Sequence, residues 1–196
     1  LNIKNEKFYH LDISKKLNDK TEKELIDLLD LNLKRAVKRQ LLSDVPVGYF
    51  LSGGLDSSLI VAIAKKIQPN SELNCYTIKT NVVDGKEGFT DDLPYARKVA
   101  KFLDVNLIEV QPKINSVKNF DKMIYQLDEP QADLAPYNVK IICELASEKG
   151  IKVMIGGVGG DDLFSGYRRH QAIMIEPFLK FIPKPLLQIV RNIIYK

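Results

Sequence analysis

The sequence has few of the residues that build metal centres and disulfide frameworks. Its 196 residues include 2 Cys, 2 His and no Trp. Cys75 and Cys143 lie far apart and form no C-x-x-C pair, so we expect free thiols and no zinc site. This cysteine usage is typical of a reducing, cytoplasmic compartment.

Long hydrophobic runs and clustered charges are also missing. No apolar stretch reaches about 18 residues and no basic, apolar leader is present, so we expect a soluble protein without a membrane partner. The 29 basic and 25 acidic residues give a formal charge of +4, and the lysines are scattered along the chain. This pattern gives no support to nucleic-acid binding.

Strand-like and helix-like segments alternate regularly along the chain. Apolar runs predict strands, and apolar residues at helical spacing predict helices. The expected strands are 47–51, 73–78, 106–110 and 151–155, and the expected helices are 21–42, 56–67, 92–103, 117–126 and 139–149. Because parallel strands need covering crossovers, this alternation predicts a doubly wound α/β fold with a mainly parallel sheet.

The same reading divides the chain into three parts. Residues 1–20 are expected to form a linker or edge segment, and residues 21–170 form the predicted core, with a long loop at 80–91. Residues 171–196 are apolar and interrupted by prolines, so they are expected to begin a further helical portion. We interpret the chain as a fragment of a longer protein.

The strongest chemical signal is the run Ser52-Gly53-Gly54-Leu55-Asp56-Ser57-Ser58, between a predicted strand and a helix. Adjacent glycines let the backbone approach a ligand, and the first N–H groups of the helix form an anion site. The hydroxyls of Ser57 and Ser58 add donors. The Asp56 carboxylate would repel a phosphate unless a cation lay between the two groups, so Asp56 is interpreted as a Mg²⁺ ligand. A Gly-Gly turn with a Ser and Asp cap is the structural alternative.

Other nucleotide and hydrolase motifs are absent. The chain has no Gly-Lys-Ser/Thr triplet of a Walker A loop and no G-x-S-x-G nucleophile elbow. The run that starts at Gly157 has Asp162 where a dinucleotide G-x-G-x-x-G motif needs its last glycine. Kinase-like P-loop and redox Rossmann functions are therefore excluded.

Four blocks in order resemble the synthetase domain of the asparagine synthetase family. They cover roughly residues 21–170, and their order is more specific than any single block. The blocks are 44–58 (DVPVGYFLSGGLDSS), 95–110 (with YARKVA), 127–133 (LDEPQAD) and 156–167 (GGVGGDDLFSGY). The resemblance implies an adenine nucleotide α-hydrolase-like fold of the ATP pyrophosphatase type, which uses ATP and Mg²⁺ to activate a carboxylate as an acyl-AMP that ammonia then attacks.

The resemblance also implies roles for particular residues. The Ser52–Ser58 loop would hold the β- and γ-phosphates, the backbone at Phe50 and Ile78 would flank adenine, and Gly156 and Gly157 would approach the ribose and α-phosphate. Asp56 and Asp161 would hold Mg²⁺, and Asp161 and Tyr167 are the candidate catalytic residues, although simple packing explains Tyr167 equally well. The expected ATP-binding set is Phe50, Leu51, Ser52, Gly53, Gly54, Asp56, Ser57, Ser58, Ile78, Gly156 and Gly157.

The chain departs from the family pattern at Val158, where an acidic residue proposed to assist attack by ammonia is usual. The departure points to an acceptor other than aspartate, such as a sugar uronate, to a base from elsewhere, or to lost activity. The implied partners are a small-molecule carboxylate, ammonia and an upstream glutaminase domain, and a homodimer is left open. Two further hypotheses stay open: a non-catalytic nucleotide-binding subunit, and another ATP pyrophosphatase of the tRNA-modifying or GMP-forming type.

Overall fold

The computed structural model describes residues 17, 19–79, 92–112, 116–127, 129 and 135–179. The predictions for most of 1–20, for the loop 80–91 and for 180–196 fall outside these residues. The helices are α1 (Glu22–Gln40), α2 (Leu55–Ile67), α3 (Leu93–Leu103), α4 (Ser116–Leu127), α5 (Ala135–Glu148), α6 (Gly160–Phe164) and α7 (Arg168–Leu179). The strands are β1 (Val47–Phe50), β2 (Asn74–Ile78), β3 (Asn106–Val110) and β4 (Val153–Ile155).

The predicted first helix is confirmed, together with its start signal. Thr21 is the N-cap of α1: its hydroxyl accepts a hydrogen bond from the Glu24 backbone N–H, and the Glu24 carboxylate accepts one from the Thr21 N–H. This reciprocal arrangement satisfies two N–H groups that a helix start otherwise leaves open. The helix then runs directly into the turn that precedes β1.

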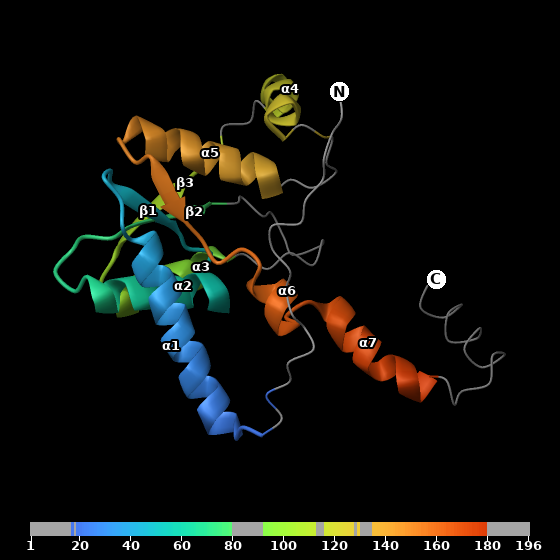
Figure 1. Ribbon diagram of the computed structural model, residues 1–196. Helices are drawn as coiled ribbons and strands as arrows, with labels where there is room; N and C mark the ends of the chain where they lie inside the picture. Colours follow the sequence, from blue (N-terminus) through green and yellow to red (C-terminus); the bar gives the residue numbers. More distant parts are fainter. Residues whose placement is uncertain are drawn as a thin grey trace, which may run out of the picture.

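All four strands are parallel, in the order β3-β2-β1-β4. The chain builds outward from β1 to β2 and β3, and then returns to the other side of β1 as β4 (Figure 1). The strand order therefore reverses between β1 and β4. In open α/β sheets, ligands bind in the crevice at the carboxyl ends of the strands that flank such a reversal.

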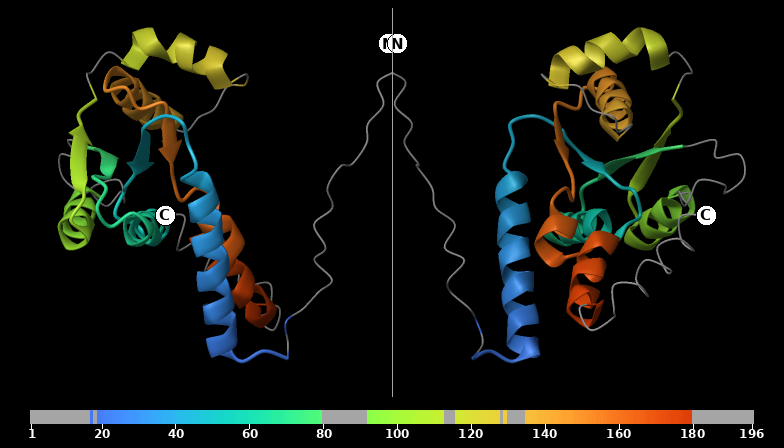
Figure 2. Two further views of the ribbon diagram at one scale, coloured as in Figure 1. Left: turned by 60° about the vertical axis from the view of Figure 1, so that its left-hand side comes forward. Right: turned by 90° about the vertical axis from the view of Figure 1, so that its right-hand side faces the viewer.

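Helices cover both faces of the sheet, which confirms the doubly wound α/β prediction. Helices α2 and α3 lie on one face, and α4 and α5 lie on the other (Figure 2). Side chains at the end of β1 alternate between two cores. Tyr49 and Leu51, which directly follows the strand, belong to the core under α2 and α3, while Phe50 packs on the core under α5. Burial on both faces explains why the strands are almost continuously apolar.

The last predicted strand begins two residues late. Ile151 was expected to start it, but the Ile151 N–H donates to Ala146 O, and Gly150 adopts a left-handed φ of +81°. These contacts end helix α5, so Ile151 caps a helix and fills the core below it. The helix predicted for 139–149 begins earlier, at Ala135.

None of the helices in the described part of the chain combines the length and the apolar character needed to cross a membrane.

Candidate functional site

The candidate site lies at the carboxyl edge of the sheet, where the strand order reverses. Strands β1 and β4 pair in register from Val47 opposite Val153 to Tyr49 opposite Ile155, so both strands end at the same edge. The Ser52–Ser58 loop follows β1 and the glycine-rich segment 156–160 follows β4. The fold therefore brings together two segments that are about 100 residues apart in sequence.

The Ser52–Ser58 loop is closed by its own hydrogen bonds. The Gly54 N–H donates to Ser52 Oγ over 3.3 Å, the Ser52 and Ser57 hydroxyls lie 3.0 Å apart, and the Ser57 hydroxyl donates to Gly54 O over 3.2 Å. One assignment satisfies all three bonds: the Ser52 hydroxyl donates a hydrogen bond to Ser57 Oγ, and the Ser57 hydroxyl donates one to Gly54 O. The Ser57 hydroxyl, expected to serve a ligand, therefore shapes the loop.

The start of helix α2 leaves donors open at the loop. Its N-cap is Gly54, and no side chain caps it, so the N–H groups of Leu55, Asp56 and Ser57 have no partner from the cap. Within the described residues, Ser58 Oγ is buried and has no hydrogen-bond partner. A buried hydroxyl without a partner costs free energy, so a hydrogen bond to a bound group would be favourable if the group reached this atom. Together these donors fit an anion.

The two glycines of the loop have different roles. Gly53 has a φ of +87°, and a Cβ there would overlap the backbone of α3, lying 2.6 Å from Tyr95 C. At Gly54 the nearest atom to an added Cβ is the flexible Ser52 Oγ, at 3.4 Å. Gly53 thus lets the loop pack on α3, and Gly54 leaves the approach to the open N–H groups clear.

Glycines after β4 pack directly on the start of α2. A Cβ on Gly157 would lie 2.8 Å from the Ser57 backbone nitrogen, and a Cβ on Gly160 would overlap the Asp56 carboxylate. Asp56 therefore lies against the residue that directly precedes Asp161. The structure brings together the two segments that carry the predicted Mg²⁺ ligands.

The two aspartates differ in their surroundings. Asp56 is half-buried against Gly160, whereas Asp161 is exposed and its carboxylate lies against Gly166. No group of three His, Cys, Asp or Glu side chains that could hold a metal occurs among the described residues. Two carboxylates without a closed cage fit Mg²⁺, which keeps several waters and takes its other ligands from phosphates.

The remaining predicted nucleotide contacts lie along the same edge. Phe50 and Ile78 end the neighbouring strands β1 and β2 and are both half-buried on the α5 face. A Cβ on Gly156 would lie 3.2 Å from the Phe50 ring, so this glycine packs on Phe50. The Leu51 side chain is fully buried and its N–H donates to Tyr76 O. Leu51 can therefore offer a ligand only its carbonyl group.

Tyr167 lies in a small cluster at the start of α7. The Arg169 guanidinium stacks 3.9 Å above the Tyr167 ring centroid and its Nη2 donates to Asp162 Oδ1 over 3.2 Å. The His170 ring meets Tyr167 edge-on. Tyr167 therefore has the packing role that the sequence left as an alternative, and a role toward substrate stays a prediction.

Val158 is fully exposed, with a relative accessibility of 101%. It lies between β4 and α6, two residues before Gly160. The side chain contributes nothing to the core, so the structural packing of the described residues does not explain the choice of valine.

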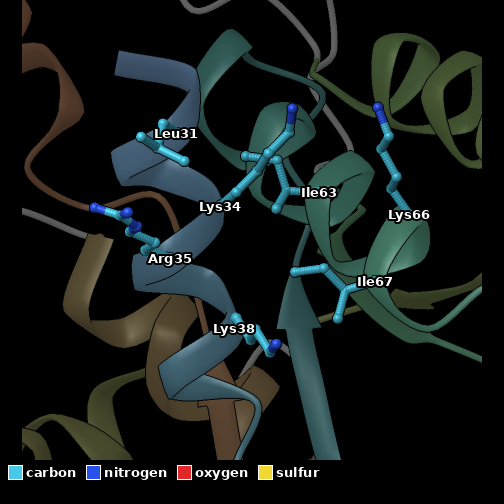
Figure 3. Close-up of a pocket in the computed structure, with 7 residues that line it drawn as sticks. All are labelled: Leu31, Lys34, Arg35, Lys38, Ile63, Lys66 and Ile67. Atoms are coloured by element: carbon cyan, nitrogen blue, oxygen red, sulfur yellow. The ribbon is translucent and has the colours of Figure 1, made fainter. Parts of the chain in front are cut away.

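A separate groove lies between α1 and α2 (Figure 3). It has a volume of about 330 Å³ and is lined by Leu31, Lys34, Arg35, Lys38, Ile63, Lys66 and Ile67, none of which belongs to the site described above. Lys34 pairs with Asp30, while Lys38 and Lys66 lie in the last turns of their helices. Helix dipoles favour basic residues there, so the basic rim has a structural cause.

Sequence reasoning missed two contacts at the site. It did not find that Gly53 packs on Tyr95 and Ala96, or that Gly160 accommodates Asp56. The signal for both is a glycine beside a functional residue, but a sequence does not say which distant segment approaches that glycine.

Comparison with known proteins identifies relatives of this chain. The family model described as asparagine synthase matches residues 28–191. A Methanocaldococcus jannaschii protein provisionally named asparagine synthetase (glutamine-hydrolyzing) 2 is 33% identical over 181 residues, covering 91% of this chain and 33% of the relative. Asparagine synthetase (glutamine-hydrolyzing) 1 of Bacillus subtilis is 30% identical over 177 residues, covering 89% of this chain and 26% of the relative.

The chain belongs to the asparagine synthase family, which confirms the resemblance read from the sequence. It spans about a third or less of the length of these two relatives. Among solved structures, the NH3-dependent NAD synthetase of Campylobacter jejuni aligns over 76% of this chain and 61% of its own, with 17% identity and a TM-score of 0.44.

Proposed function

We propose that this chain is the nucleotide-binding core of an ATP-dependent amide-forming ligase. The observation that carries the proposal is the uncapped start of α2, together with the buried, unpartnered Ser58 Oγ, at the edge where the strand order reverses. Such a cluster of donors at a helix N-terminus fits a phosphate group. Membership of the asparagine synthase family supports the choice of ATP as the source of that phosphate.

In the proposed reaction the acceptor carboxylate oxygen attacks the α-phosphorus of ATP. The bond between the α-phosphorus and the bridging oxygen breaks, and pyrophosphate leaves with the acyl-AMP still bound. Ammonia then attacks the acyl carbon, and the products are an amide, AMP and a proton. Pyrophosphate leaves as a unit, so the loop needs donors that hold two phosphates together and no lysine that follows a single transferred phosphate.

The loop residues hold these phosphates in the proposal. The N–H groups of Leu55, Asp56 and Ser57 and the hydroxyl of Ser58 are the donors, and Gly54 leaves their approach open. The donors are fixed before a ligand arrives, because Ser52 and Ser57 close the loop. A preorganised site of this kind avoids the cost of ordering the donors on binding.

Asp56 and Asp161 are proposed to hold Mg²⁺ against the phosphates. The cation would offset the repulsion between Asp56 and the phosphates and would stabilise the charge on the leaving pyrophosphate. The proposal is supported by the contact between Asp56 and Gly160, which places the two acidic segments side by side. Phe50, Ile78, Gly156 and Gly157 would accommodate the adenosine part along the same edge.

The acceptor is proposed to be a carboxylic acid that approaches past Val158. The exposed valine presents an apolar surface and accepts no proton, so the base that receives the ammonia proton is another group. The relatives named above carry the term glutamine-hydrolyzing in their names and are about three times as long as this chain. We therefore propose that ammonia comes from a glutaminase part of the whole protein.

Pyrophosphate release in the presence of different carboxylic acids tests the proposed function. The full chain, with ammonium salts and Mg·ATP, is incubated with aspartate, uronates and other acids, and pyrophosphate and AMP are measured. We expect equal amounts of both products with at least one acid, and none in a Ser58→Ala, Asp56→Asn double variant. Hydrolysis of ATP to ADP and phosphate in wild type would contradict the proposal.

One observation favours a second function. Val158 stands where the family pattern has an acid, and a nucleotide-binding subunit without catalysis would tolerate this change. Tight Mg·ATP binding with no pyrophosphate release across the whole panel of acids would support that function. Restored turnover in a Val158→Glu variant would then identify the valine as the cause.

A further inference from the structure

An ion pair links the edge strand β3 to helix α3. Arg97 Nε lies 2.6 Å from Glu109 Oε1, and Arg97 Nη2 lies 2.8 Å from Glu109 Oε2. Both nitrogens of the guanidinium fork therefore bind both oxygens of one carboxylate, which fixes direction as well as distance. Arg97, together with Lys79, holds the pKa of Glu109 below its usual value of 4.5.

The pair is anchored on the sheet at one end. Glu109 is in register with Thr77 of β2, and the Lys79 N–H donates to Val110 O over 2.9 Å just beyond the end of that strand. At the other end, Arg97 directly follows Ala96, which is the residue that packs on Gly53. Two contacts, joined by the peptide bond between Ala96 and Arg97, therefore connect β3 with the Ser52–Ser58 loop.

Apolar packing holds α3 on the main core. Its buried side chains are Leu93, Ala96 and Ala100, and the partly buried Val99 and Leu103 pack against the same core. The bidentate ion pair adds a directional polar link from this helix to the sheet, which restricts how the helix can shift.

We infer that Arg97 and Glu109 are positioning residues for the phosphate-binding loop. They hold the first turns of α3 in the place where Tyr95 and Ala96 meet Gly53, and Gly53 in turn sets the left-handed bend that aims the open N–H groups of α2. An exposed ion pair contributes little to global stability. We therefore expect removal of the pair to change the geometry of this loop while the fold stays stable. The expected effect on ATP affinity rests on the proposed function. The expected effect on the conformation of the Ser52–Ser58 loop does not.

Amide hydrogen exchange of the ligand-free full chain tests the inference directly. In Arg97→Met and in Glu109→Gln we expect exchange to rise by roughly tenfold at the two loop amides that are hydrogen-bonded in wild type. These are the Gly54 N–H, which donates to Ser52 Oγ, and the Ser58 N–H, which donates to Gly54 O. Exchange in α5 should stay as in wild type. The double variant should exchange no faster than either single variant, since each one already breaks the pair.

A matched control separates loop geometry from general loss of charge. Lys34→Met removes the Lys34–Asp30 pair on α1, which is also an exposed pair, and should leave exchange at Gly54 and Ser58 unchanged. Unchanged exchange at these two amides in Arg97→Met, or an equal rise throughout the chain, would overturn the inference.

Calorimetric titration with Mg·ATP provides the second readout. Arg97→Met should bind about tenfold more weakly than wild type, a difference of about 1.4 kcal/mol, and Lys34→Met should bind as wild type does. If wild type binds no Mg·ATP, the proposed function fails while the exchange measurement still decides the role of the pair. If wild type binds and Arg97→Met binds equally well, the positioning role is wrong.

Discussion

The two halves of the candidate site are supported in different ways. The Ser52–Ser58 loop lies between β1 and α2, whose buried residues belong to the main core, and it is closed by its own hydrogen bonds. The half after β4 rests on α6, in which no residue is buried. Large apolar side chains of this half are exposed: Val158, Leu163, Phe164, Ile173, Met174 and Ile175.

In the proposed function, this difference separates the residues that hold phosphate from those that complete the reaction. The donors of the proposed phosphate site lie beside the main core of the described residues. Asp161 and Tyr167 are carried by a segment whose apolar side chains find no cover among the described residues. Substitutions in the first half should therefore change stability or nucleotide affinity strongly, and those in the second half should change stability little.

The largest contrast is expected between two leucines. Leu51 is fully buried beside the loop, so Leu51→Ala should lower the free energy of unfolding by about 2–5 kcal/mol. Leu163 in α6 is 78% exposed, and Leu163→Ala should stay within about 0.5 kcal/mol of wild type. Urea unfolding followed by circular dichroism measures both. A similar loss in the two variants would mean that α6 belongs to the cooperative core.

The next contrast uses two glycines with similar backbone angles. Gly53 and Gly159 have φ values of +87° and +93°, so alanine at either position should cost about 1–2 kcal/mol of left-handed strain. An added Cβ at Gly159 meets nothing within 4 Å, whereas at Gly53 it overlaps the backbone of α3. Gly53→Ala should therefore lose more stability, and should also lose Mg·ATP affinity in a titration. Equal effects would show that the contact with α3 is unimportant.

The two serines should separate stability from binding. Ser57→Ala breaks the ring of hydrogen bonds and should lower the free energy of unfolding by about 0.5–1.5 kcal/mol. Ser58→Ala removes a buried hydroxyl that has no partner in the described chain, so it should leave stability equal or slightly higher while weakening Mg·ATP binding. Thermal unfolding and calorimetry measure the two effects. Full affinity in Ser58→Ala would remove this hydroxyl from the site.

The thiol in the core should have no titration effect near neutral pH and should lower stability only at high pH. Burial raises the pKa of Cys75 from 9.0 to about 12, and the pKa of the adjacent Tyr49 to about 12 as well. Above pH 9 the unfolded chain releases the thiol proton and the folded chain keeps it, so the free energy of unfolding should fall as pH rises from 9 to 12. Urea titrations at several pH values should show a shallower fall in Cys75→Ala. At pH 8 the folded protein should leave Cys75 unmodified by thiol reagents.

The elements of the sheet were predictable because their signals are local. Each strand is a short apolar run, and the capping box at Thr21 and Glu24 marks the start of α1 in the sequence itself. The late start of β4 was not predictable in this way. Ile151 is apolar and β-branched, and only the contact of its N–H with Ala146 O shows that it ends a helix.

The sequence shows the motifs of the candidate site, but it does not show how their side chains are arranged in space. The Ser52–Ser58 motif and Asp161 are visible in the sequence, and the parallel sheet brings their segments to one edge. The sequence does not show that Ser57 serves the loop while Ser58 stays without a partner. That distinction depends on where each hydroxyl lies in the first turn of α2, which the motif does not encode separately.

Calorimetric titration of Mg·ATP into the full chain and into its Asp56→Asn variant tests the central claim most directly. Asparagine keeps the shape that packs on Gly160 and removes only the charge, and Asp162→Asn is the control at the same edge. The account predicts binding in wild type and in Asp162→Asn, and no Mg²⁺-dependent binding in Asp56→Asn. Equal binding in all three would contradict the assignment of the Ser52–Ser58 loop and Asp56 as the Mg·ATP site.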